Sequence, residues 1–182
     1  MKLLNILNEK DKFLKKKCKD VVFPMEDYDK NLIEDMIEYL KNTQMEDIAT
    51  KYDLRPGMGL AANQLGRGLN YFVVVLDKEE NLGDFDVWVV INPKIISSSK
   101  ELIYAEYGEG CLSIERDVEG IVLRNARITV ECYDIDGNKQ TFRVREDIAI
   151  AFQHEMDHLN GILFTSKTIK ETNNIKETIR SI

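Results

Sequence analysis

Short runs rich in β-branched residues follow one another between Tyr71 and Val144, with turn residues rather than helical stretches between them. Runs of this length and composition are typical of β-strands. The expected strands are residues 71–76, 87–91 (ending at Asn92-Pro93), one or two within 95–107, then 118–123, 128–134 and 140–144. Because strands joined by short turns, such as Asp136-Gly137, pair antiparallel, the chain is predicted to be an α+β domain with antiparallel or mixed sheets.

Two segments with helical spacing flank the strand-rich part. From residue 29 to about residue 52, apolar residues recur every three or four positions, and Asp29 stands where an N-cap is expected. Residues 147–159 have the same spacing and end at Asn160-Gly161, which is typical of a helix C-terminus. The sequence therefore predicts an N-terminal amphipathic helix and a second helix around which the sheets pack.

The chain has 182 residues, the usual size of one domain, so residues 1–182 are expected to form a single domain. Its tail, from about residue 165, is polar. Ile169, Ile175 and Ile179 indicate a short surface helix within the tail.

Charge and cysteine content exclude several functional classes. The net charge is −7 and the isoelectric point is near 5.0, which argues against a partner that is free nucleic acid. No stretch approaches the roughly 20 apolar residues that a membrane-spanning helix needs. Cys18, Cys111 and Cys132 are too few and too scattered for a disulfide framework, which favours a reducing compartment. We expect a cytoplasmic protein without a membrane partner.

The chain contains two histidines, and they stand four residues apart, as His154 and His158, in the segment His-Glu-Met-Asp-His. Residues i and i+4 lie on the same face of a helix, so both imidazoles can reach one metal ion. Glu155 is placed where a carboxylate can approach a water molecule beside the metal rather than the metal itself. The spacing indicates a catalytic metal site. The alternative is a helix that carries two histidines on a polar face by chance.

A catalytic site of this kind takes a third protein ligand, and the sequence offers two sources for it. Glu171 and Glu177 follow the helix and would give the ligand set of a zincin-like metallopeptidase, but they stand in a polar tail. Cys111 is the better candidate. It lies in a loop where Gly108 and Gly110 allow a tight backbone, and a loop cysteine beside polar residues can be a thiolate.

A third segment, residues 57–64, reads GMGLAANQ. Its small residues let a ligand approach the backbone closely, and Gln64 offers an amide donor at its end. Taken alone, the segment is equally typical of a glycine turn before a strand. It is not a dinucleotide-binding motif, because the third glycine is absent and the run precedes a strand.

Together, GMGLAANQ (57–64), EGCLS (109–113) and QHEMDHLNG (153–161) resemble the three signature motifs of peptide deformylases, in the family's order. The resemblance extends from about Val21 to Phe164. Residues 51–57 and the insertion near residues 81–86 are similar to the second bacterial type of the family. Asn63, Glu146 and Asp147 depart from the family's usual residues, which affects the expected details of the pocket rather than the reaction.

The resemblance implies a metal-dependent hydrolase that removes the N-formyl group from the N-terminal formylmethionine of newly made polypeptides and releases formate. It makes Cys111, His154 and His158 the metal ligands and Glu155 the acid–base residue. The zincin-like metallopeptidase is the alternative, and the two are distinguished by whether Cys111 is a ligand.

By the same resemblance, the side-chain amide of Gln64 and the backbone N–H of Leu112 stabilise the oxyanion that forms on the formyl group. Asp157 is expected to pair with Arg124 and steady the helix behind the site. The residues expected to bind the substrate are Gly57, Gly59, Leu60, Tyr107, Glu109, Gly110, Ile150 and Ala151.

The implied cofactor is one divalent metal ion. Two imidazoles and a thiolate suit Fe(II), Zn(II), Ni(II) or Co(II), and the family resemblance points to Fe(II). The implied partners are N-formylmethionyl nascent peptides. The tail carries a small excess of basic residues, and we therefore also expect the protein to dock on the ribosome.

Overall fold

The computed structural model describes residues 3–78, 83–170 and 178–182, and within them the chain forms a mixed α+β fold. The larger sheet has the strand order β1-β2-β3-β6-β7, and all of its neighbours are antiparallel. Its strands are β1 (Gly59–Ala61), β2 (Tyr71–Asp77), β3 (Phe85–Ser98), β6 (Arg127–Tyr133) and β7 (Lys139–Arg145). The smaller sheet consists of β5 (Arg124–Asn125), β4 (Leu102–Tyr104) and β8 (Ile179–Ser181), with β8 parallel to β4. The predicted α+β class with antiparallel sheets is confirmed.

In the described part of the chain the sheets are accompanied by the α-helices α1 (Asp27–Gln44), α2 (Glu46–Tyr52) and α3 (Glu146–Leu159). Short 3-10 turns form η1 (Lys12–Lys15), η2 (Ala62–Leu65) and η3 (Phe164–Ser166). The helix predicted over residues 29–52 is two helices, because Met45 adopts an extended conformation between them. Among the described residues, no helix combines the length and apolar content that crossing a bilayer requires.

Asp29 does not cap α1 as predicted. It lies within the first turn, is buried, and accepts hydrogen bonds from the Arg67 guanidinium at 2.6 and 2.8 Å and from the Tyr71 hydroxyl at 3.0 Å. The carboxylate is therefore compensated by a long-range charge pair, which spacing along the helix alone does not reveal.

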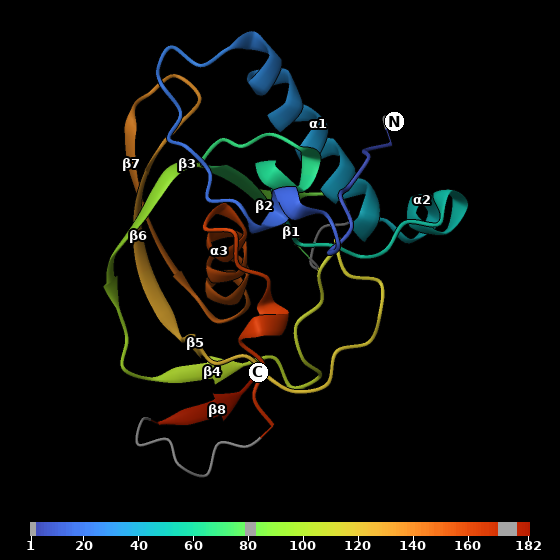
Figure 1. The fold of residues 1–182 in the computed structure, drawn as a ribbon, viewed down its shortest axis with the longest axis vertical. Helices are drawn as coiled ribbons and strands as arrows, with labels where there is room; N and C mark the ends of the chain where they lie inside the picture. The colour runs from blue at the N-terminus through green and yellow to red at the C-terminus, as the bar shows by residue number, and fades with distance from the viewer. Residues whose placement is uncertain (1–2, 79–82, 171–177) are drawn as a thin grey trace.

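Helices α1 and α3 bury their apolar faces against the larger sheet. The stripe Leu32, Ile33, Met36 and Leu40 of α1 packs with residues of β2 in one cluster. In a second cluster Phe152 of α3 meets Phe72 of β2 edge to face, with ring centroids 5.2 Å apart. Helix α3 also contacts β1, β5, β6 and β7, and Figure 1 shows it between the two sheets. Side chains on α3 are thereby held from several directions.

Strand β3 does not stop at Asn92-Pro93 as predicted but continues to Ser98. Asn92 has a positive φ of 52°, and its side chain bonds both the N–H and the carbonyl of Val21, at 2.8 and 3.0 Å. The register with β6 shifts between Ile91 and Lys94. A proline is tolerated at such an irregularity, because no regular ladder hydrogen bond is lost there.

The prediction of a strand over residues 118–123 is wrong. Apart from a single bridge between Ile121 and Ile169, this segment pairs with no strand among the described residues. Its apolar Val122 packs instead with Ile114 and Phe164 in a small loop cluster. Apolar content alone could not distinguish a strand from a loop buried in this way.

The tail also differs from the expected surface helix. Ile179 lies in strand β8, and residues 171–177, which include Ile175, lie outside the described part of the chain. Ile169 forms the bridge to Ile121.

The N-terminal segment crosses the molecule and joins parts that are far apart in sequence. The backbone N–H groups of Leu7 and Glu9 donate to the carbonyls of Gln64 and Ser113, each at 2.8 Å. Farther along, the N–H of Cys18 donates to the carbonyl of Leu159 at the end of α3, also at 2.8 Å. The segment therefore fixes all three motif-bearing regions to one another.

Candidate active site

Helix α3 and the loop before β5 bring together the three side chains predicted to bind a metal. His154 and His158 are buried on one face of α3, and Cys111 comes from the loop. The Sγ atom of Cys111 lies 3.2 Å from Nε2 of His158, and the ligand atoms of the three residues all lie within 4.8 Å of one another. Donors bound to one ion at about 2.0–2.3 Å each lie about 3–4 Å apart, so this set fits a tetrahedral site.

An unpaired carboxylate oxygen beside these three residues agrees with that fit. Glu155 Oε2 is buried and has no hydrogen-bond partner among the described residues. An unpaired buried carboxylate oxygen is costly, and one is expected where a bound ion and its water complete a site. The residues present therefore fit a divalent metal.

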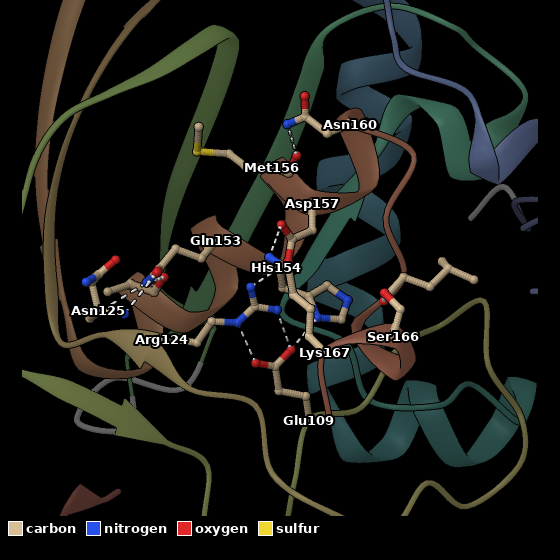
Figure 2. A network of polar contacts seen from close by, with 12 residues as sticks. Glu109, Arg124, Asn125, Gln153, His154, Met156, Asp157, Asn160, Ser166 and Lys167 are labelled. Atoms are coloured by element: carbon tan, nitrogen blue, oxygen red, sulfur yellow. Dashed lines mark hydrogen bonds and ion pairs between the residues drawn. The ribbon is translucent and has the colours of Figure 1, made fainter. Parts of the chain in front are cut away.

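A buried charge network holds the first histidine ligand (Figure 2). Nδ1 of His154 contacts Oε2 of Glu109 at 2.8 Å, which leaves its other nitrogen for a metal. Arg124 donates to both oxygens of Glu109, at 2.7 and 2.9 Å, and to Asp157 at 2.5 Å. Lys167 donates to the other oxygen of Asp157 at 2.6 Å. The predicted pairing of Asp157 with Arg124 is confirmed.

This network determines the protonation state of the Glu109 carboxyl. Burial acts to raise the pKa of its carboxyl, but hydrogen bonds and charges from Arg124 and His154 outweigh burial and lower that pKa to about 2. The sequence predicts Glu109 as a substrate-binding residue. In the structure its side chain lines the cavity, but both oxygens are already engaged by Arg124 and His154.

Glu155 lies at the floor of the site and is only 3% exposed. Burial raises the pKa of its carboxyl to about 7, against the opposing effect of the nearby His154. Room for the carboxylate depends on Gly59 of β1, where a Cβ atom would lie under 3.0 Å from the Glu155 side chain. Glu155 of the third motif therefore requires a glycine at residue 59 of the first motif.

Gln64 is held in a fixed orientation between two of the motifs. Its Oε1 atom accepts the N–H of Ala61 at 2.8 Å, and its Nε2 atom donates to the Ser113 hydroxyl at 3.0 Å. The same Nε2 atom lies 3.7 Å from Cys111 Sγ. Because an amide nitrogen carries two hydrogens, one remains directed toward the ligand group.

Arg55, which the sequence analysis missed, supports the loop that carries Cys111. Its guanidinium donates to the carbonyl of Ile114 at 2.7 Å and to the carbonyl of Leu112. Fixing these carbonyls also fixes the adjoining peptide planes. No spacing rule signals such a side-chain-to-backbone contact.

These groups open into a cavity of about 260 Å³. It is lined by residues 56–59 on one side, by Gly108–Leu112 on a second, and by Asp147, Ile150, Ala151, His154 and Glu155 of α3 on a third. Of the predicted substrate-binding residues, Gly57, Gly59, Glu109, Gly110, Ile150 and Ala151 line it. Leu60 and Tyr107 do not: Leu60 is fully buried in the core, and Tyr107 is 97% exposed outside the cavity.

The alternative third ligands, Glu171 and Glu177, lie outside the described residues. Within the described part of the chain, one group of cysteine, histidine and carboxylate side chains has the geometry for a metal ion, and it contains Cys111.

Comparison with known proteins supports the same kind of function as the geometry of the site does. The polypeptide deformylase family model matches residues 3–174. The peptide deformylase of Shouchella clausii is 45% identical over 161 residues, which cover 88% of this chain and 86% of that protein. Peptide deformylase 2 of Bacillus anthracis is 41% identical over 167 residues, 92% of this chain and 90% of that protein.

The fold agrees as well. The crystal structure of peptide deformylase from Thermotoga maritima superposes with a TM-score of 0.71 at 31% identity, covering 93% of this chain and 99% of that one. The deformylase structure from Legionella pneumophila gives a TM-score of 0.71 at 29% identity over 92% of this chain and 87% of that one. From the family match, the identities and the shared fold, this chain belongs to the polypeptide deformylase family and is a metal-dependent hydrolase of that kind.

Proposed function

We propose that the removal of the formyl group from N-formylmethionyl peptides, with release of formate, takes place in the cavity between α3, residues 56–59 and the Cys111 loop. The observation that supports this most directly is the close approach of Cys111 Sγ and His158 Nε2, at 3.2 Å, beside the buried carboxylate of Glu155. A zincin-like peptidase has no use for a cysteine at that position.

Cys111, His154 and His158 are the residues that would hold the metal ion. When bound, the ion supplies Lewis-acid polarisation of the formyl oxygen and makes a neighbouring water more acidic. The hydrogen bond from His154 to Glu109 fixes the orientation of that imidazole and increases its basicity.

Glu155 is proposed as the acid–base residue. Its carboxylate faces the cavity, and Oε2 is free to accept a proton from the attacking water. The same carboxyl then returns the proton to the departing amine, so that one residue serves both half-steps.

Gln64 and the backbone N–H of Leu112 are proposed to stabilise the negative charge that develops on the formyl oxygen. The Gln64 amide is preorganised by its bonds to Ala61 and Ser113. The Leu112 N–H shares its peptide plane with the Cys111 carbonyl, which accepts a hydrogen bond from the N–H of Ile114 at 3.0 Å. Donors that need no reorganisation during the reaction contribute most to catalysis.

The peptide substrate is proposed to bind along the glycine-rich segment. Among the described strands, β1 stands at the end of the larger sheet, so one of its edges has no strand neighbour there. A peptide added there bonds through its main chain, which suits an enzyme that processes many different sequences. Ile150 and Ala151 offer the apolar wall that a methionine side chain requires.

Fe(II) is proposed as the native ion. A thiolate ligand donates charge and weakens the Lewis acidity of the ion. Fe(II) and Ni(II) expand their coordination more readily than Zn(II) and can compensate for that loss. The cost of Fe(II) beside a thiolate is oxidation in air.

The deciding experiment measures formate release from formyl-Met-Ala-Ser by apo protein reconstituted without oxygen with Fe(II), Ni(II) or Zn(II). We expect activity that is lost in air with Fe(II), stable with Ni(II) and low with Zn(II). Equal, air-stable activity with Fe(II) and Zn(II) would contradict the choice of ion alone. Cleavage of the unformylated Met-Ala-Ser peptide, without formate release, would contradict the assigned reaction.

We place this activity in the cytoplasm, where formylated chains are made, and propose docking on the ribosome through the tail. The cations that suggest it are Lys167, Lys170 and Arg180, together with Lys176, which lies outside the described residues. Within the described part, these three already pair with acidic groups of the protein. Ribosome co-sedimentation that is unchanged after deletion of residues 168–182 would remove this proposal.

A further inference from the structure

We propose that a groove on the uncovered face of strands β6 and β7 binds RNA through its phosphate backbone. The groove has a volume of about 550 Å³ and is lined by residues 97–99 of β3 and the loop after it, residues 127–129 of β6 and residues 143–145 of β7. None of these residues lines the cavity beside Cys111, so the inference goes beyond the proposed reaction and uses a surface other than the tail.

The groove lies on the part of the larger sheet that α1 leaves uncovered. Helix α1 contacts β1, β2 and β3, and Ile91 of β3 and Tyr133 of β6 pack at that side of the sheet. Because side chains alternate along a strand, Arg127 and Thr129 point to the same face as Tyr133. Figure 1 shows β6 and β7 at the far end of the sheet from α1. The face that is packed under α1 is therefore open over these two strands.

The groove carries positive charge that the protein does not fully neutralise. Arg143 and Arg145 are exposed, and neither has an ion pair or a hydrogen bond among the described residues. Arg127, directly opposite Arg145 in the strand pairing, contacts Glu101 at 2.7 Å, but Glu101 is shared with Arg180. No aspartate or glutamate lines the groove. A chain with a net charge of −7 thus gathers three arginines in one place.

This arrangement suits a row of phosphates. Like charges directly opposite each other on two strands destabilise a sheet, and an anion bound between them offsets that cost. Arginine binds phosphate through two parallel N–H donors. Arg143 and Arg145 are about 7 Å apart along β7, so a chain of phosphates can reach both where a single ion cannot. The hydroxyl groups of Ser97, Ser98 and Thr129 line the same groove, and hydroxyls are common donors to nucleic-acid phosphates.

The arginines also have a purely structural explanation. Among the described strands, β7 is the last of the larger sheet, and charged side chains on an edge strand prevent other chains from pairing with it. That role concerns aggregation and leaves RNA binding unaffected, so experiment separates the two. The acidic overall charge weakens attraction at a distance. Binding then depends on the contacts in the groove, and we expect it to be non-specific, with a Kd of about 10⁻⁵ M.

The experiment measures binding of the full-length, metal-loaded enzyme to a fluorescently labelled RNA duplex, by anisotropy, over a range of salt concentrations. We expect the logarithm of the binding constant to fall with the logarithm of the salt concentration with a slope of roughly −2 to −3, as for about three phosphate contacts. Arg143→Gln combined with Arg145→Gln should weaken binding about tenfold or more at low salt and reduce the slope by about two. Arg143→Lys combined with Arg145→Lys should retain the slope, because the charges remain.

Lys12→Gln combined with Lys15→Gln is the matched control. It removes two charges from the exposed, lysine-rich turn η1, and neither residue lines the groove. The control should leave RNA binding unchanged. Formate release from formyl-Met-Ala-Ser should be the same in both glutamine variants and the unaltered enzyme, so the result does not depend on the proposed reaction. An unchanged rate also shows that the variants are folded.

Three results would overturn the inference. The first is no binding to the RNA duplex at low salt, or binding that the arginine-to-glutamine variant does not weaken. The second is binding to vesicles that contain phosphatidylserine without binding to the RNA, which would make the partner a membrane surface. The third is aggregation of that variant with unchanged RNA binding, which would assign the arginines to protection of the sheet edge.

Discussion

The two halves of helix α3 differ in their polar contacts and in the exposure of their end residues, although they belong to one continuous element. The half from Gln153 to His158 is largely buried, and Arg124 and Glu109 bind it from outside the helix. The half that begins at Glu146 is exposed at its start, and Glu146 has a positive φ of 54°. The C-terminal half holds His154, Glu155 and His158 in place, and the N-terminal half contributes Asp147, Ile150 and Ala151 to the cavity lining.

The difference shows how structural restraint is distributed along this helix. Groups that must keep an orientation to a fraction of an ångström lie where packing and hydrogen bonds restrain them from several sides. The exposed first turn has fewer such restraints, so a substitution there should disturb little else. Four substitutions test this division, from the largest expected effect to the smallest.

Glu155→Gln should abolish nearly all turnover, by a factor of roughly 10³ or more, while the metal is retained. The three ligands are untouched, and the amide has nearly the shape of the carboxyl but cannot accept the proton. Formate release and metal content, measured on the same preparation, check this. Activity equal to that of the unaltered enzyme, at equal metal content, would show that the base is another residue.

Gly59→Ala should act on the same carboxylate from the opposite side. A Cβ atom at residue 59 would collide with the Glu155 side chain, and displacement of a catalytic group by about 1 Å can cost up to about 100-fold in rate. Steady-state kinetics should show the loss mainly in kcat. Gly68→Ala is the control, since its Cβ would meet only ordinary contact, with Phe13 at 3.5 Å. Full activity in Gly59→Ala would mean that Glu155 does not need its present position.

Asp157→Asn should lower stability more than activity. It weakens the contacts to Arg124 and Lys167 and leaves the Glu109 bond to Arg124 in place. The expected cost is about 1–3 kcal/mol in the free energy of unfolding, measured by urea denaturation, because the arginine stays buried with one partner fewer. An unchanged urea midpoint would show that the network does not stabilise the buried half.

Glu146→Gln should have the smallest effect. Its ion pair with Arg180 is partly exposed, and ion pairs in contact with solvent contribute little to stability. A double-mutant cycle with Arg180→Gln measures the coupling directly. A coupling as large as the loss in Asp157→Asn would contradict the proposed difference between the two halves.

Sequence patterns predicted the site better than they predicted the sheets. The three motifs identified Cys111, His154 and Glu155 correctly as neighbours, because each motif carries residues whose chemistry requires the others. The pairing of Asp157 with Arg124 was predictable too, since the reactive face of the helix leaves that carboxylate behind the site.

The remaining features depend on contacts that leave no local pattern. Asn92 adopts a left-handed conformation because its side chain binds Val21, 71 residues earlier, and so β3 passes the proline. Leu60 is apolar and was predicted to bind the substrate, yet its side chain packs into the core behind β1. Arg55 binds the backbone carbonyl of Leu112, and because every residue has such a carbonyl, no sequence pattern signals the contact.

The bonds of the N-terminal segment have a consequence for the order in which the site is assembled during translation. Leu7 and Glu9 bind the Gln64 and Ser113 backbones, and Cys18 binds Leu159, which is among the last helical residues to be made. Residues 7–18 must therefore wait for α3 before all of their partners are present. Since contacts of such large sequence separation form late, the thiol of Cys111 stays without His154 and His158 until α3 has been made and has packed.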